Sequence, residues 1–168
     1  MRILGIDPGL RVTGYGAVDC SADDARLVEG GIIAPSVRAP LEARLAELHR
    51  ELCSVLVATR PDVMVVEELW SGYKNPTTAV LMGHARGVIC LAAYAHGVRL
   101  RHLGHSLVKR ALTGSGAARK EQVKRVVMRH LALRSVPQPD DVSDALALAL
   151  ALANIERTET RLARAGIA

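Results

Sequence analysis

Residues 1–16, MRILGIDPGLRVTGYG, set the terms for the whole fold. A short apolar run ends at Asp7, and three glycines follow within nine residues. Burying an unpaired carboxylate costs several kcal/mol or forces it to become neutral. A carboxylate at the end of an apolar strand therefore indicates either a structural cap or a ligand for a cationic group.

The segments that follow alternate between strand and helix patterns. Residues 2–7, 14–19 and part of 26–35 predict three strands joined by short turns, which is typical of an antiparallel meander. Apolar residues three and four apart predict an amphipathic helix over 41–59. Further on, the pattern predicts a central strand in 62–69, a helix from Pro76, a strand in 98–104, a short helix capped by Ser106 and ending near Gly114, a helix in 120–133 and a last helix starting near 137–142.

This order predicts an α/β protein with a five-stranded mixed sheet and helices on both faces. The 168 residues, 49% of them hydrophobic, fit one domain, which we place at 1–156, with a frayed tail at 157–168. Three distant cysteines without a Cys-x-x-Cys pair favour a reducing cytosol. We find neither a signal peptide nor an apolar run near the length of a spanning helix, and so expect a soluble cytoplasmic protein with no membrane contact.

Positive charge is concentrated in one region. The net charge is +5, and between residues 99 and 134 the only acidic residue is Glu121, against ten lysines and arginines. Such asymmetry favours a polyanionic partner. The plain alternative is a solvated helix face.

Carboxylates recur at comparable places. Asp7 and either Glu67 or Glu68 end apolar strands, and Asp141 and Asp144 share one face of the last helix. Glu67 and Glu68 alternate across their strand, so only one can face such a site. A carboxylate cluster repels itself unless divalent cations occupy it, and two such ions can cleave a phosphodiester. With the basic region, this predicts a nuclease.

Each carboxylate also has a structural alternative. Asp7 could close a turn with Gly9, as Asp-Pro-Gly sequences readily do. Asp140, Asp141 or Ser143 could cap the last helix.

Five stretches taken together resemble the RuvC family of Holliday-junction resolvases, whose fold is ribonuclease H-like. They are GIDPGLRVTGYG (5–16), VVEELW (65–70), ARGV (85–88), LVKRALTGSG (107–116) with Lys120 after it, and DVSDALALA (141–149). The resemblance runs from residue 1 to about 152. It implies an endonuclease that resolves four-way DNA junctions by two symmetric metal-dependent nicks in strands of like polarity, leaving 5′-phosphate and 3′-hydroxyl ends.

The resemblance also assigns residues. The metal ligands would be Asp7, Glu67, Asp141 and Asp144, holding two Mg²⁺ ions, with Mn²⁺ as the alternative. Lys109 and Lys120 would lie beside the cleaved phosphate, and Trp70 would stack on a junction base. The expected DNA contacts are Trp70, Tyr73, Lys74, Lys109, Arg110, Arg119, Lys120 and Lys124. Asp140 is an extra acid next to the third ligand.

The implied partners are the DNA junction, a second copy of the chain and the branch-migration motor of RuvA and RuvB. A C2 dimer would match the twofold symmetry of the junction, and the small residues of the helix from Pro76 to Ala95 could form its interface. The competing interpretations are a non-catalytic junction-binding scaffold, a broader nuclease, and an actin-like or sugar-kinase-like phosphotransferase. The last would need a second comparable domain, for which the chain is too short.

Overall fold

The computed structural model describes residues 1–21, 24–68 and 75–167. Its strands are β1 (Arg2–Asp7), β2 (Thr13–Cys20), β3 (Ala25–Ile33), β4 (Val63–Glu67) and β5 (Arg99–Leu103). Its helices are α1 (Leu41–Thr59), α2 (Pro76–Ala95), α3 (His105–Thr113), α4 (Lys120–His130) and α5 (Asp140–Arg164).

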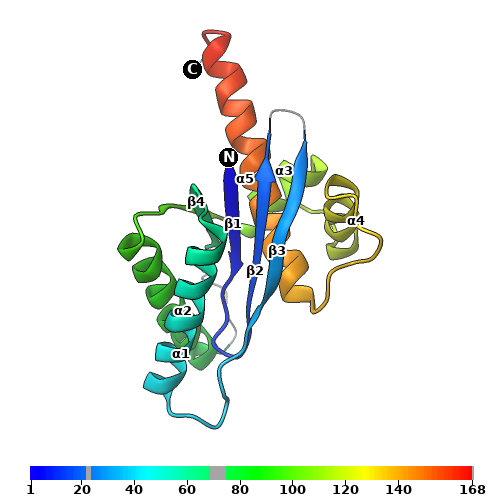
Figure 1. The fold of residues 1–168 in the computed structure, drawn as a ribbon. Helices are drawn as coiled ribbons and strands as arrows, with labels where there is room; N and C mark the ends of the chain where they lie inside the picture. The colour runs from blue at the N-terminus through cyan, green and yellow to red at the C-terminus, as the bar shows by residue number, and fades with distance from the viewer. Residues whose placement is uncertain (22–23, 69–74, 168) are drawn as a thin grey trace.

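The strands form one mixed sheet in the order β3-β2-β1-β4-β5. β1, β2 and β3 pair antiparallel, which confirms the predicted meander, and β4 and β5 join β1 in parallel. α1 and α2 cover one face of the sheet, and α3, α4 and α5 cover the other (Figure 1). The predicted five-stranded α/β architecture is therefore confirmed.

Each face of the sheet has its own apolar core because side chains alternate along the strands. Leu4, Ile6, Met64 and Val66 point toward α1 and α2. Ile3, Val63 and Val65 point toward the three other helices, in the core that contains most of α5. Asp7 and Glu67 continue this second series, so the alternation carries them to the α5 side of the sheet.

α5 lies directly on the sheet because the strands carry glycines beneath it. A Cβ at Gly5 would collide with the carbonyl oxygen of Ala145, and one at Gly14 with the carbonyl oxygen of Asp141. From residue 142 to 153 nearly every α5 residue is buried, which suits a helix of alternating Ala and Leu. The N-terminus of α5 therefore lies beside the end of β1.

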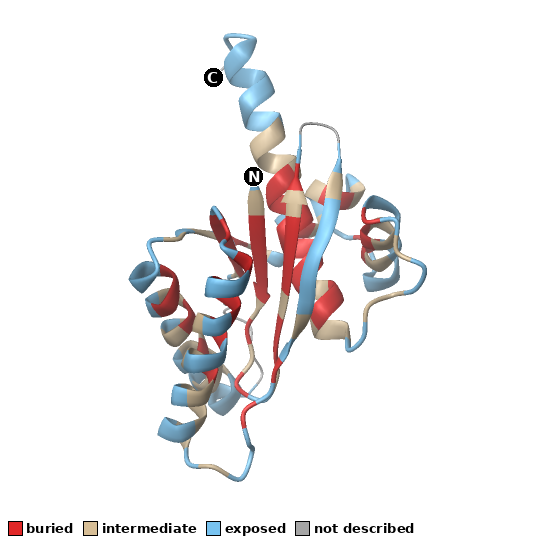
Figure 2. Ribbon diagram, viewed as in Figure 1, coloured by how far each residue is buried: buried red, intermediate tan, exposed pale blue. Residues whose placement is uncertain are grey.

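One sequence expectation, the cap of α3, is wrong, and two features of α5 bear on the others. α3 begins at His105 with Gly104 as its N-cap, so Ser106 is not the capping residue, because the chain turns into the helix directly after β5. No side chain caps α5, whose N-cap is Pro139. α5 continues as an exposed helix to Arg164, beyond the predicted boundary at 156 (Figure 2); fraying of this tail stays a prediction.

α2 is also more apolar than expected. It contains an 18-residue window with a mean hydropathy of 1.3. By length and composition alone, it is the one helix among the described residues that is long and apolar enough to cross a membrane. The expectation that no run approaches that length is therefore wrong. Ala85, Ile89, Ala92 and Ala93 are nevertheless buried in the core shared with α1 and the sheet.

Candidate active site

A cavity of about 150 Å³ opens where the ends of β1 and β4 meet α3, α4 and α5. This volume is below the roughly 300 to 1,000 Å³ that is usual for small-molecule pockets. It suits ions and a phosphate group better than a nucleoside triphosphate, which disfavours the phosphotransferase interpretation. Its polar lining is Asp7, Glu67, His105, Lys109, Lys120 and Asp144.

The strand carboxylates, Asp7 and Glu67, reach the cavity from adjacent parallel strands. Glu68 does not line it, because its side chain starts from the opposite side of β4. Asp7 does not close the turn that follows it: Thr13 Oγ1 does so, donating to the Gly9 carbonyl at 2.6 Å. The turn-closing alternative for Asp7 therefore has no support in the structure.

Asp7 carries an unusual electrostatic load. Burial, followed by the charges of Glu67, Asp144 and Asp141, raises the pKa of Asp7 to about 7. Lys120 acts in the opposite direction but does not compensate. The carboxylates thus lie close enough to destabilise the ionised form of Asp7, as expected of a site that binds a cation.

The helix carboxylates, Asp141 and Asp144, lie in the first turns of α5. Asp144 lines the cavity, whereas Asp141 does not; it packs beside Gly14, the β2 partner of Asp7 in the sheet. Its charge nevertheless contributes to the raised pKa of Asp7. Since α5 has no capping side chain, neither Asp141 nor Asp140 has the role of helix cap.

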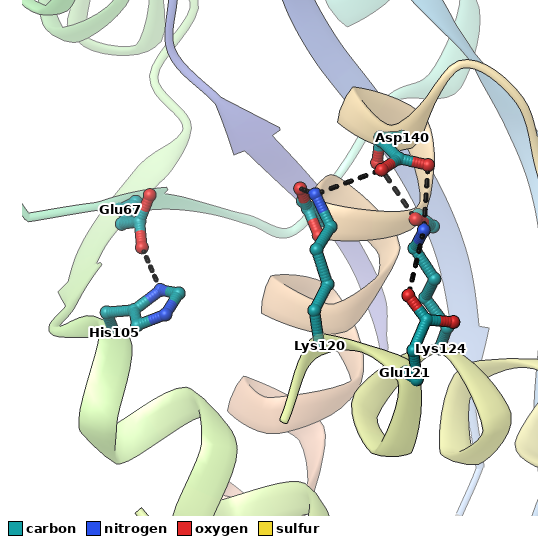
Figure 3. Close-up of polar contacts among 8 residues, drawn as sticks. Glu67, His105, Lys120, Glu121, Lys124 and Asp140 are labelled. Atoms are coloured by element: carbon teal, nitrogen blue, oxygen red, sulfur yellow. Dashed lines mark hydrogen bonds and ion pairs between the residues drawn. The ribbon is translucent and has the colours of Figure 1, made fainter. Parts of the chain in front are cut away.

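Lysines from α4 neutralise this end of α5. Lys120 Nζ lies 2.8 Å from Asp144 Oδ2 and 3.2 Å from Asp140 Oδ2, and Lys124 Nζ lies 2.9 Å from Asp140 Oδ1 (Figure 3). Burial opposes the charge of Lys120, but its bonds to Asp144 and Asp140 outweigh that cost and raise its pKa. Bonds from Lys124 and Lys120 lower the pKa of Asp140. Asp140 thus pairs with these two lysines and does not line the cavity.

The other predicted DNA-contacting residues are distributed unevenly. Lys109 lines the cavity; Arg110 and Arg119 are exposed, but neither is part of the cavity lining. Only 12% of the Lys124 side chain is exposed, since its ammonium group is engaged with Asp140 and Glu121. Trp70, Tyr73 and Lys74 lie outside the described residues.

His105 is a cavity residue that the sequence analysis missed. Its Nδ1 lies 2.8 Å from Glu67 Oε1, and the two side chains face each other in Figure 3. A signal for it existed: His105 and Lys109 are four residues apart on one helix and so share a face. Among the described residues, no group of three or more acidic, His or Cys side chains is already arranged to hold a metal ion.

Known proteins resemble this chain both in sequence and in structure. A family model described as crossover junction endodeoxyribonuclease RuvC matches residues 3–152. The crossover junction endodeoxyribonuclease RuvC of Rhodopirellula baltica is 46% identical over 148 residues, which cover 88% of this chain and 83% of the relative.

Solved structures agree. A structure of T. thermophilus RuvC in complex with a Holliday junction substrate has a TM-score of 0.87 and 34% identity, covering 95% of this chain and 98% of that one. The yeast mitochondrial Holliday junction resolvase Ydc2 shares the fold at 14% identity, with a TM-score of 0.70 and coverage of 95% and 82%.

Proposed function

Because the chain belongs to the RuvC family of crossover junction endodeoxyribonucleases, we propose that the carboxylate cavity is the place where it cuts a four-way DNA junction. The protein is an endonuclease that resolves Holliday junctions. The observation that supports the assignment of the cavity is the meeting of Asp7, Glu67 and Asp144 with two lysines around one small opening.

The donor set fits divalent cations. Asp7, Glu67, Asp141 and Asp144 offer hard carboxylate oxygens, which Mg²⁺ and Mn²⁺ both accept. The pKa of Asp7, which is raised first by burial and then by the charges of Glu67, Asp144 and Asp141, supports this ligand set, because a bound cation would stabilise the ionised carboxylate. Two Mg²⁺ ions are our proposal, with Mn²⁺ as the alternative. Bound there, the ions would supply an activated water and stabilise the leaving 3′ oxygen.

The chain's own residues account for the rest of the chemistry. Lys109 and Lys120 would offset the charge that builds on the reacting phosphate, as fixed cations do in a partly buried site. Lys120 would exchange its bond to Asp144 for the phosphate, while Asp140 keeps it close to the cavity. The two nicks would fall symmetrically in strands of like polarity and leave 5′-phosphate and 3′-hydroxyl ends.

A homodimer would place two such cavities symmetrically about the twofold axis of a junction. α2 supports a subunit contact: Val80, Leu91 and Tyr94 are exposed, and among the described residues nothing lies within 4 Å of a Cβ placed at Gly83 or Gly87. We propose α2 as the interface, and RuvA and RuvB as the motor partners. We also propose that residues 1–156 form one nuclease domain, that Trp70, Tyr73 and Lys74 contact the junction, and that the protein acts in the cytoplasm.

The test is cleavage of a synthetic four-way junction beside a linear duplex of the same sequence, with Mg²⁺, Mn²⁺ or a chelator. Wild type should make paired nicks in the junction only, and only with metal. Asp141→Asn and Asp144→Asn should abolish nicking yet still bind the junction in chelator. Normal cleavage by Asp141→Asn would remove it from the ligand set, and binding without cleavage by wild type under every condition would indicate a scaffold.

A further inference from the structure

His105 stands at a place where it can control the geometry of one metal ligand. It is the first residue of α3, and Val108 and Leu112 anchor that helix in the core beneath α5. Its side chain is 71% exposed, so it is not held in place by burial. It lines the cavity together with Lys109, one helical turn further along.

The contact itself has a definite direction. An ionised carboxylate only accepts hydrogen bonds, so His105 Nδ1 must donate to Glu67 Oε1 across the 2.8 Å that separates them. Glu67 Oε2 is then left available for another ligand. Among the described residues, this is the one side-chain polar contact of Glu67.

Glu67 needs such a contact more than the other carboxylates do. Asp7 has a short side chain fixed by a paired strand, and Asp144 is held by Lys120. Glu67 has an additional methylene group and one more rotatable bond at the end of β4, with 29% of its side chain exposed. Without a partner, its carboxylate would sample several rotamers at a cost in side-chain entropy when a ligand binds.

We propose that His105 is a positioning residue that orients the Glu67 carboxylate for a divalent cation. Hydrogen-bonding partners behind metal ligands fix ligand orientation, and their loss typically costs about 10- to 100-fold in metal affinity or activity. This inference rests on the proposed function, because it takes Glu67 as a cation ligand. It adds a residue from α3 behind a set of proposed metal ligands that come from β1, β4 and α5.

The experiment measures Mg²⁺ binding without DNA, by the rise in melting temperature as Mg²⁺ is titrated. His105→Ala should raise the half-saturating Mg²⁺ concentration about tenfold or more. His105→Asn should recover most of the loss, because its amide N–H starts near the position of Nδ1. His130→Ala, which removes another exposed imidazole away from the cavity, should change nothing.

Two further measurements keep the inference separate from the proposed function. Adding His105→Ala to Glu67→Gln should produce no additional loss of Mg²⁺ binding, since the carboxylate that it orients is gone. Junction affinity in chelator should be the same for His105→Ala and wild type. An unchanged Mg²⁺ midpoint, or a loss of junction affinity in its place, would overturn the positioning role and indicate a direct phosphate contact. If Glu67→Gln and Asp7→Asn themselves left Mg²⁺ binding intact, the proposed metal site would be the part that fails.

Discussion

Asp7 and Glu67 on the strands and Asp144 on α5 line one cavity, but the strand side and the helix side differ in how their charge is balanced. Asp7 is partly buried among other acids, and its pKa is raised to about 7. On the helix side, Lys120 contacts Asp144 and Asp140, and the pKa of Asp140 is lowered by its lysine partners. Without a cation, the ionised form of Asp7 is therefore destabilised by burial and by the neighbouring negative charges. On the helix side, Lys120 already pairs with Asp144, and an incoming cation must displace its ammonium group.

The largest effect is expected from Asp7→Asn, which removes the strand carboxylate whose pKa is raised. Junction cleavage should fall by at least about 100-fold, because losing even a hydrogen-bonding partner behind a metal ligand typically lowers metal affinity or activity about 10- to 100-fold. At the same time the metal-free protein should become more stable at pH 8. Gel-based nicking and thermal denaturation in chelator measure the two effects.

The pH dependence of that gain follows from the direction of the pKa shift. From pH 3.8 to about 7 the unfolded chain loses the Asp7 proton while the folded protein keeps it, so rising pH lowers the stability of wild type over this range. Above pH 7 the penalty is complete, at up to about 4 kcal/mol. The advantage of Asp7→Asn should thus be larger at pH 8 than at pH 5. A variant less stable than wild type at pH 8 would contradict the comparison.

Lys120→Met should sharpen the comparison on the helix side by moving two quantities in opposite directions. Cleavage should fall about 10- to 100-fold, because the reacting phosphate loses a nearby cation. The half-saturating Mg²⁺ concentration should drop several-fold, because Asp144 no longer has an ammonium group to displace. Lys124→Met, whose lysine pairs with Asp140 and not with Asp144, is the control and should leave the midpoint unchanged. A higher midpoint for Lys120→Met would mean that the lysine supports metal binding.

The smallest effect is expected from Asp140→Asn. It weakens the ion pairs that link α4 to α5 without removing a cavity carboxylate, so we expect a slightly lower melting temperature and less than about a threefold change in cleavage rate. Asp144→Asn, four residues away on the same helix, should abolish cleavage under identical conditions. Equal losses for the two variants would show that Asp140 is itself a ligand.

The sequence allowed the strand carboxylates to be found because charge at the end of an apolar strand is locally anomalous. Strand alternation also showed that only one of Glu67 and Glu68 could face a site, and the structure places Glu67 at the cavity. The spacing of Asp141 and Asp144 predicted a shared helix face. These features depend on local patterns of two to four residues.

The contacts among these groups were not predictable in the same way. Pairing of Lys120 with Asp144 depends on how α4 packs against α5, and these residues are 24 positions apart. The His105 contact joins residues 38 positions apart through the packing of α3. Asp141 lies outside the cavity lining because α5 packs on β2 with Asp141 beside Gly14. Each is a tertiary result that no local pattern encodes.

The glycines beneath α5 have a consequence for how the site tolerates change elsewhere. Where Gly5 meets Ala145 and Gly14 meets Asp141, main chain rests on main chain, so no side chain acts as a spacer between the strand and helix carboxylates. Substituting Leu150 or Leu152 with smaller residues would open voids and lower stability, but would not reset that separation. The separation of the strand and helix carboxylates therefore does not depend on the size of the core side chains. Mutations of those side chains should lower the stability of the protein well before they alter the chemistry of the site.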